Sequence, residues 1–131
     1  VWSKVSLELT GKDVQTGPVI GVMSFMYPSP NGDVYCKLYN QTLKSDALII
    51  ANIQTSAISQ NQNVSQLSTE IVINNRTVGL DYQVAIQSGG GFSVSSSVSE
   101  SAAQGFVPIK LCVWGKQVAN WNVLYSLSVL Q

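Results

Sequence analysis

Histidine is absent from this chain of 131 residues, and charged residues are scarce. Without histidine the chain lacks the commonest general base, the commonest metal ligand and the usual partner of a catalytic serine or cysteine. Charged side chains make up 11% of the residues, and seven basic residues balance seven acidic ones. Because a protein that binds nucleic acid through its phosphates needs a basic surplus, this composition excludes a nucleic-acid partner.

Signals for membrane insertion and export are also missing. The sequence has no run of about 18 apolar residues, so no transmembrane helix and no membrane insertion are predicted. The chain opens on Val1, Trp2 and Ser3 and not on the basic, apolar and small-residue order of a signal peptide. We therefore interpret it as a mature product or an excised domain.

Motifs that carry chemistry are lacking too. Two cysteines cannot build a four-cysteine zinc site, and neither a phosphate-binding loop nor a dinucleotide-binding glycine motif occurs. A glycosidase needs only two carboxylates that meet in space, and the sequence leaves that pairing open. The acidic residues nevertheless occur singly, as Glu8, Asp13, Asp33, Asp46, Glu70, Asp81 and Glu100. They are interpreted as surface acids, and we predict a protein that is not an enzyme and holds no cofactor or metal.

What the sequence does contain is alternation of apolar and polar residues with period two, which is typical of half-buried strands. An Asn-Gly turn is expected within 28–33, a hairpin turn at Asn74 and Asn75, and a long surface loop over 53–68. The expected strands are 5–10, 19–27, 34–39, 46–52, 69–74, 77–87, 92–95, 106–114 and 122–131. About eight strands without a convincing helix predict one all-β domain over 1–131, an antiparallel β-sandwich or jelly roll. Pro108 favours an edge position or a bulge for its strand.

The two cysteines, Cys36 and Cys112, both lie in strand-like segments. In an oxidising compartment they would form one disulfide that closes a long loop. Otherwise they would be two buried thiols that behave as small apolar residues. Both alternatives stay open at the level of sequence.

Contact with another molecule is expected on the loops, because recognition commonly lies on loops held by a rigid scaffold. The predicted receptor-binding residues are Gln60, Asn61, Asn63, Asn74, Asn75, Arg76 and Gly90. The rings of Trp2, Trp114, Trp121, Tyr27, Tyr35 and Tyr39 are interpreted mainly as core or strand-pair residues. Contact between copies of the chain is expected at one face of 19–27 and at Leu124 and Leu130, which could instead face a second sheet.

Several segments resemble the head, or knob, of an adenovirus fibre. Residues 1–3 are similar to the Leu-Trp-Thr signature at the junction of shaft and head, and 4–10 to the first strand of the head. Residues 21–25 and 45–50 resemble its second and third strands, and the final strand runs to Gln131 as in fibre heads. The resemblance is to compact, non-mammalian heads. It implies a homotrimer at the fibre tip on the virion surface that binds a host-cell receptor, either protein or glycan.

Two other classes fit the same pattern. In a bacterial pilus subunit, residues 1–10 would be donated as a strand to the open sheet of a neighbour. A secreted β-sandwich lectin would act alone. Either alternative places the protein outside the cell or on the bacterial surface.

Overall fold

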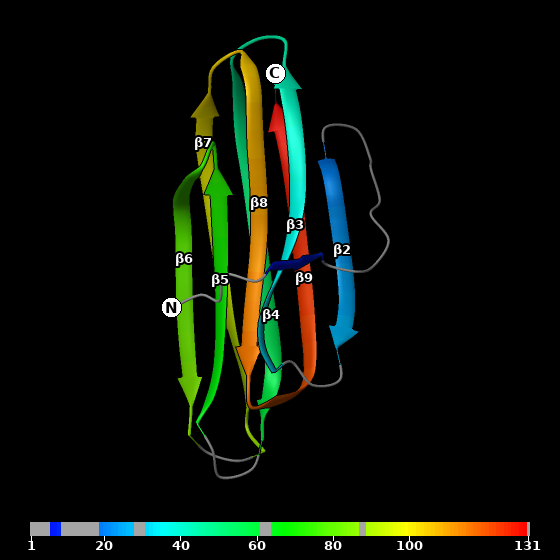
Figure 1. The fold of residues 1–131 in the computed structure, drawn as a ribbon, viewed down its shortest axis with the longest axis vertical. Helices are drawn as coiled ribbons and strands as arrows, with labels where there is room; N and C mark the ends of the chain where they lie inside the picture. Colours follow the sequence, from blue (N-terminus) through cyan, green and yellow to red (C-terminus); the bar gives the residue numbers. More distant parts are fainter. Residues whose placement is uncertain (1–5, 9–18, 28–30, 61–63, 87–88, 131) are drawn as a thin grey trace.

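The computed structural model describes residues 6–8, 19–27, 31–60, 64–86 and 89–130, which form nine β-strands (Figure 1). In chain order the strands are β1 (Ser6–Glu8), β2 (Val19–Tyr27), β3 (Asn31–Leu43), β4 (Ala47–Ser59), β5 (Ser65–Ile73), β6 (Arg76–Ala85), β7 (Gly91–Ala102), β8 (Gly105–Lys116) and β9 (Val118–Leu130). These ranges contain no helix, so the predicted all-β class is confirmed. In particular, they contain no helix long and apolar enough to cross a membrane.

The strands form two sheets that pack face to face. One sheet has the order β2-β9-β4-β7 and the other the order β1-β3-β8-β5-β6. Every pair in both sheets is antiparallel apart from the parallel pair of β1 and β3. From β2 onward, successive strands alternate between the sheets except at the β5–β6 hairpin, which gives the jelly-roll order of an eight-stranded sandwich. The predicted jelly roll is therefore confirmed.

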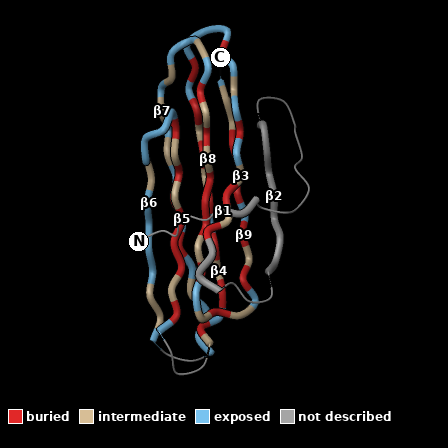
Figure 2. Tube along the Cα trace, viewed as in Figure 1, coloured by how far each residue is buried: buried red, intermediate tan, exposed pale blue. Residues whose placement is uncertain are grey.

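The core lies between the two sheets, where buried residues lie along one side of β3, β4, β5, β8 and β9 (Figure 2). On β4 the buried positions alternate strictly, with Ala47, Ile49, Ala51 and Ile53 all turned inward. Leu111 on β8 and Trp121 on β9 are fully buried from the two opposing sheets. Burial of apolar surface on this scale is the main source of stability, at roughly 25 cal/mol for each Å² removed from water.

The prediction of a long surface loop over 53–68 is wrong. β4 continues to Ser59 and β5 begins at Ser65, and residues 61–63 lie outside the described residues. The alternation is hidden because Thr55, Ser59 and Ser65 occupy inward positions yet carry hydroxyl groups. Each of these side chains is buried, and the Thr55 hydroxyl donates a hydrogen bond to the Asn122 carbonyl at 2.8 Å. Polar side chains of this size are tolerated in a core when they are hydrogen-bonded.

The predicted turn at 28–33 is only partly covered by the structure. Residues 28–30 lie outside the described residues, and Asn31–Asp33 are wrongly predicted as turn, because β3 already begins at Asn31. The register of β3 with β8 shifts between Asn31 and Val34, so the pairing is irregular over the residues predicted as turn. β7 is likewise longer than the predicted strand at 92–95, because its serine-rich half continues to Ala102.

Pro108 lies within β8, which is a central strand and not an edge. The neighbouring strand β5, however, ends at Ile73, whose partner on β8 is Ile109. Pro108 therefore comes just after the pairing with β5 has ended, and its carbonyl accepts a hydrogen bond from Asn74 N at 2.9 Å. β8 is locally an edge at this point, and for this reason the missing N–H of proline is tolerated.

Cys36 and Cys112 form a disulfide, which resolves the alternative that the sequence left open. The two residues are direct partners across β3 and β8, with a Cα–Cα distance of 4.1 Å. Val34 is buried beside them, and Trp114 packs against this cluster. The bridge lies on the opposite side of the sheet from the main core.

Of the six rings considered in the sequence, Trp114, Trp121, Tyr35 and Tyr39 take core or strand-pair positions, as expected. The rings of Tyr35 and Trp121 are 5.3 Å apart, and the hydroxyls of Tyr39 and Tyr125 are hydrogen-bonded at 2.8 Å. Trp2 lies outside the described residues, and the side chain of Tyr27 is likewise not described. The Tyr35–Trp121 and Tyr39–Tyr125 pairs therefore join the two sheets across the core.

Candidate functional site

The outward side of the β2-β9-β4-β7 sheet carries a set of uncharged side chains on three adjacent strands. Their alternation with buried residues places these side chains away from the core. The outward positions are Leu48, Ile50, Asn52, Gln54, Ser56 and Ile58 on β4, Ser93, Ser95, Ser97, Ser99 and Ser101 on β7, and Asn122, Leu124, Ser126, Ser128 and Leu130 on β9. We call these residues the serine–amide face, and none of them is charged.

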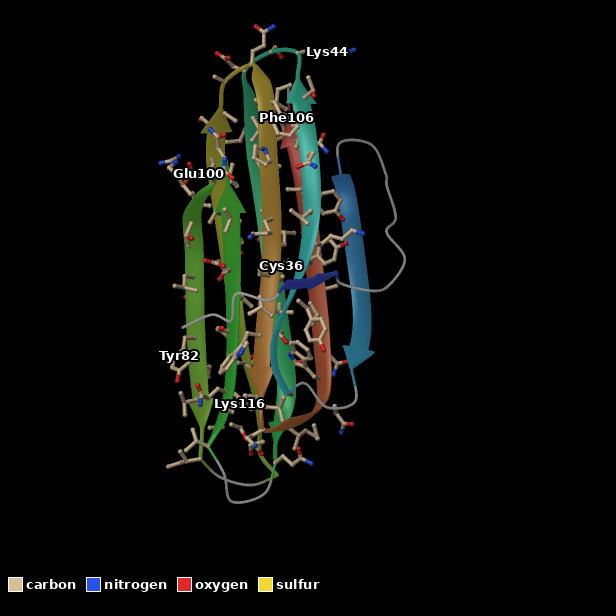
Figure 3. All side chains as sticks on the ribbon, in the orientation of Figure 1. Cys36, Lys44, Tyr82, Glu100, Phe106 and Lys116 are labelled. Carbon is tan, nitrogen blue, oxygen red and sulfur yellow. A yellow bond between two sulfur atoms is a disulfide. The ribbon has the colours of Figure 1, made fainter. Side chains whose placement is uncertain are left out.

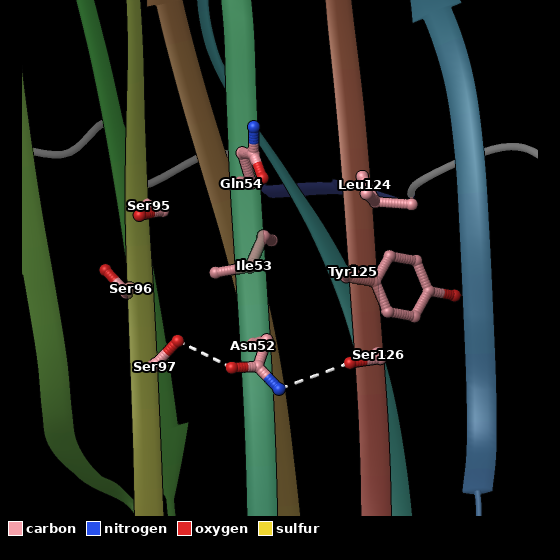
Figure 4. Close-up of a pocket in the computed structure, with 9 residues that line it drawn as sticks. All are labelled: Asn52, Ile53, Gln54, Ser95, Ser96, Ser97, Leu124, Tyr125 and Ser126. Carbon is pink, nitrogen blue, oxygen red and sulfur yellow. Dashed lines mark hydrogen bonds between the residues drawn. The ribbon is translucent and has the colours of Figure 1, made fainter.

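A hydrogen-bonded row crosses the middle of this face (Figure 4). The Ser97 hydroxyl donates to Asn52 Oδ1 at 2.5 Å, and Asn52 Nδ2 donates to the Ser126 hydroxyl at 3.3 Å. Since the three residues are register partners on β7, β4 and β9, the backbone already aligns them. The row fixes the orientation of the Asn52 amide without help from a loop.

The row leaves hydrogen-bonding capacity unused at both ends. The Ser97 hydroxyl donates its hydrogen to Asn52, so its oxygen can still accept a hydrogen bond. The Ser126 hydroxyl accepts a hydrogen bond from Asn52, so its hydrogen can still be donated. Neighbouring strands lie about 4.8 Å apart, which places this acceptor and this donor about 10 Å from each other. Gln54 follows two residues further along β4 and is exposed. The face thus offers a fixed pattern of donors and acceptors.

Three shallow hollows follow one another along the face. The central hollow lies around Asn52 and has a volume of about 330 Å³. A second, of about 410 Å³, lies beside Ser56 and Asn122, and a third, of about 460 Å³, lies beside Leu48 and Ser101 at the other end. Volumes of this order suit small ligands or single units of a longer one. The arrangement fits an elongated molecule better than a compact one.

The described loop residues among those predicted to bind a receptor are split between opposite ends of the sandwich. Gln60 and Gly90 lie together where β4 ends and β7 begins, and the Ser59 N–H donates to the Gly90 carbonyl at 2.9 Å. The Gln60 N–H donates to the Gln117 carbonyl at 3.1 Å. Asn61 and Asn63 lie outside the described residues.

Asn74, Asn75 and Arg76 lie at the far end of β5 from Gln60. Asn74 and Asn75 form the predicted hairpin turn with φ of 56° and 63°. Positive φ at both central residues is typical of a type I′ turn, which matches the twist of the flanking strands. The five predicted residues that the structure describes therefore do not form one site.

Sequence reasoning missed the residues of the serine–amide face. The sequence pattern predicts Asn52 at the end of a strand and Ser97 in a serine-rich stretch after the strand at 92–95. The available signal was the alternation of Ser97, Ser99 and Ser101 with Val98 and less exposed positions. It shows that one side of a strand is polar, but not which strands lie beside it.

The described part of the chain offers few side-chain groups for metal binding or thiol chemistry. No group of three or more histidine, cysteine or carboxylate side chains is close enough there to hold a metal ion. Both cysteines are joined to each other. What the serine–amide face can do is bind a neutral partner through hydroxyl and amide groups.

No family model matches the chain, and no curated protein has a matching sequence. Solved structures with a similar arrangement of strands include carbohydrate-binding modules. A CBM36 module in complex with calcium and xylotriose is 15% identical and aligns over 91% of this chain and 97% of its own, with a TM-score of 0.40. CBM35 from Cellvibrio japonicus Abf62 is 15% identical over 93% of this chain and 82% of its own, with a TM-score of 0.39.

The C-terminal CBM6 of LamC from Zobellia galactanivorans is 18% identical over 92% of this chain and 91% of its own, with a TM-score of 0.35. Identities and TM-scores this low assign no family, ligand or binding residue to the chain.

Proposed function

We propose that this domain is a non-catalytic attachment module that binds a neutral glycan along its serine–amide face. The observation that carries the proposal is the row of Ser97, Asn52 and Ser126 in the middle of an uncharged sheet surface. Sugar hydroxyls both donate and accept hydrogen bonds, and the row offers one acceptor and one donor at fixed positions. A rigid strand framework loses little conformational entropy when the ligand binds.

The lack of charge favours a neutral ligand over an ionic one. Covering a charged side chain would cost several kcal/mol unless the ligand supplied a partner of opposite sign. The serine–amide face has no such side chain, and its hydroxyl and amide groups need only ordinary hydrogen bonds. Asp46, which lines the hollow beside Leu48, already accepts a hydrogen bond from the Gln104 N–H at 3.2 Å. The exposed apolar side chains of Leu124 and Ile58 add surface against which the less polar faces of sugar rings can pack.

The succession of three hollows favours an oligosaccharide over a single sugar. The hollows extend from Ile58 to Leu48 on β4, a distance of about 34 Å at 3.4 Å for each residue. Individual hydrogen bonds to neutral groups contribute only about 1 kcal/mol each. Several units bound in neighbouring hollows are therefore needed for useful affinity.

The proposal is tested on an array of neutral oligosaccharides, followed by titration calorimetry with the hexasaccharide that gives the strongest signal. Asn52→Ala removes the amide that joins the row, and we expect the affinity to fall about tenfold or more because the Ser97 and Ser126 hydroxyls are no longer held in fixed orientations. Thermal unfolding should show that the variant remains folded, since Asn52 is on the outer side of β4.

Gln66→Ala is the matched control. Gln66 is an outward, partly buried amide on the other sheet, where its Oε1 accepts a hydrogen bond from the Tyr82 hydroxyl at 3.2 Å. This variant should bind like the unchanged protein. Equal losses in Asn52→Ala and Gln66→Ala, or the absence of binding to any neutral glycan, would contradict the proposal.

A second candidate function is the trimeric fibre head that the resemblance in sequence implies. Leu48 and Leu130 are neighbours across β4 and β9, and these two and Leu124 are 37%, 41% and 48% exposed on the same face. Exposed leucines on one surface favour contact with copies of the chain, which was expected at Leu124 and Leu130. In that case the serine–amide face is a subunit interface and the receptor binds elsewhere.

Light scattering separates the two candidates. A discrete trimer that becomes a monomer in Leu124→Lys supports the fibre head, because a lysine there would be buried without a partner. A monomer that still binds glycan supports the attachment module acting alone. Ser99→Lys, on the exposed edge strand β7, shows whether any added charge on this face has the same effect.

A further inference from the structure

A fourth, smaller hollow lies at the end of the sandwich where β5, β7 and β8 come together. Its volume is about 210 Å³, and its lining includes Asn74, Arg76, Glu100, Gln104 and Phe106. We call it the end hollow. Unlike the serine–amide face, it combines a cation, an anion, two amides and an aromatic ring.

The charged groups of the end hollow are free to meet a ligand. The structure describes no ion pair between Arg76 and Glu100, and the Arg76 side chain is exposed. A guanidinium group presents a planar fork of donors that matches a carboxylate with two parallel hydrogen bonds. Glu100 accepts hydrogen bonds from hydroxyl groups and disfavours a ligand with two negative charges, such as a phosphate monoester.

Phe106 adds an apolar platform to the same hollow. Its side chain is 63% exposed, which is unusual for a ring of this size, and Figure 3 shows it near the start of β8. Exposed aromatic rings provide rigid contact area at a small cost in conformational entropy. A ligand that fits here has one apolar face, hydroxyl groups at its edge and a single carboxylate.

Backbone contacts hold the walls of the end hollow in place. The Asn74 N–H donates to the Pro108 carbonyl at 2.9 Å, and the Gln104 N–H donates to the Asp46 carboxylate at 3.2 Å. Gly105 turns the chain into β8 with φ of 129°, a conformation that L-residues with a side chain rarely adopt. Three connections are thus fixed around the hollow before any ligand arrives, which limits the entropy lost on binding.

The end hollow continues the line of hollows on the serine–amide face. Ser101, Ala102 and Ala103 line both the end hollow and the neighbouring hollow beside Leu48. Ser97, in the central row, is four residues from Ser101, or about 14 Å along β7. One oligosaccharide can therefore occupy the neutral face and place its terminal unit in the end hollow.

We infer that the end hollow binds a terminal uronic acid residue of an otherwise neutral oligosaccharide, with the carboxylate of the sugar held by Arg76. Phe106 packs against the sugar ring, and Glu100 and Gln104 bond to its hydroxyl groups. This inference rests on the proposed function, because the rest of the oligosaccharide occupies the serine–amide face. It adds a preference for one chemical class of chain end.

The test compares two hexasaccharides in titration calorimetry, identical except that one carries a uronic acid and the other the corresponding neutral sugar at its non-reducing end. The full chain should bind the acidic ligand about ten- to a hundredfold more tightly, the range expected for a charge-assisted pair of hydrogen bonds. In Arg76→Gln this preference should disappear while the affinity for the neutral ligand stays unchanged. Arg76→Lys should keep only part of it, because lysine cannot make the paired contact.

Equal affinities of the full chain for the two ligands would overturn the inference and leave the proposed function standing. A preference that persists in Arg76→Gln would also overturn it, since the carboxylate would then bind elsewhere. Failure of both ligands to bind would overturn the proposed function and this inference together. Thr77→Ala, which changes the next residue of β6, is the control for effects of substitution on the hairpin.

Discussion

At the scale of single residues, the clearest feature is a polar bridge between the two sheets. Ser96 on β7 is 2% exposed, and its hydroxyl donates to the Asp81 carboxylate at 2.7 Å. The Thr69 and Ser96 hydroxyls are 2.6 Å apart, and Thr69 is the donor when the Ser96 hydrogen is on Asp81. Thr69 and Asp81 are partners across β5 and β6, so the bridge joins the edge strand β6 to the opposite sheet.

We expect Ser96→Ala to lower the free energy of unfolding by about 1–3 kcal/mol, because the buried Thr69 hydroxyl loses its partner. Thr69→Val combined with Ser96→Ala should cost less than the sum of the single changes, since no orphaned hydroxyl then remains. Urea unfolding of the unchanged protein, the two single variants and the double variant measures the interaction energy between the two hydroxyls. Strict additivity would show that the two hydroxyls do not act as a pair, and Ser95→Ala, outward on the same strand, should change little.

The sequence indicates where single residues turn the chain better than it indicates which residues bind. The pair Asn74 and Asn75 predicts a hairpin turn because asparagine tolerates positive φ, and the structure confirms the turn. Asn52 gives no such signal, since its importance depends on Ser97 and Ser126, which are 45 and 74 residues away. Alignment between strands so far apart in sequence is a property of the sheet order.

At the scale of elements, β6 is unusual because it turns large apolar side chains toward solvent. Leu80 and Tyr82 are 54% and 56% exposed, and Figure 3 shows the Tyr82 side chain at the side of the molecule. The inward side of β6 carries Asp81, which bonds to Ser96, and Gly79, whose hydrogen faces Val98. Because β6 is an edge strand in the described sheet, its inward side meets β7 and not the apolar centre.

The β5–β6 hairpin provides a test at this scale. Asn75 has φ of 63°, where glycine is unstrained and a residue with an ordinary side chain is disfavoured by about 1–2 kcal/mol. We expect Asn75→Gly to be as stable as the unchanged protein or more so, and Asn75→Ala to lose about 1 kcal/mol. Denaturant midpoints compare them, with Asn40→Ala on β3 as the control. Equal stability of the alanine and glycine variants would contradict the type I′ turn.

At the scale of the whole molecule, the jelly roll is held together by pairings between distant parts of the chain. The Cys36–Cys112 disulfide spans 76 residues and joins β3 to β8 at the centre of one sheet. A cross-link over a loop of this length restricts the unfolded chain by about 4 kcal/mol in the chain-entropy model, although measured gains are commonly about 2–4 kcal/mol.

We expect reduction of the disulfide to lower the free energy of unfolding by about 2–4 kcal/mol, measured by urea unfolding with and without a reducing agent. The Cys36→Ala, Cys112→Ala double variant should resemble the reduced protein and lose all sensitivity to the reductant. Unchanged midpoints on reduction would mean that the cross-link does not constrain the unfolded chain.

The class of fold follows from composition and period-two alternation, because each strand must bury one side whichever strands lie beside it. The lengths of β4, β5 and β7 could not be predicted from the sequence, since the buried hydroxyls of Thr55, Ser65 and Ser96 make the inward sides of these strands look polar. The candidate site was the least predictable feature. It needs the order β9-β4-β7, which brings together segments from the middle and the end of the chain.

We propose that this domain binds through the outer face of a sheet and not through its loops. Nuclear magnetic resonance of the ¹⁵N-labelled protein, titrated with the best neutral hexasaccharide from the array, tests it most directly. The side-chain amide signals of Asn52 and Gln54 and the backbone signals of Ser97 should shift together as ligand is added. Shifts confined to Gln60, Gly90 and the other loop residues, with Asn52 and Ser97 unmoved, would contradict the claim.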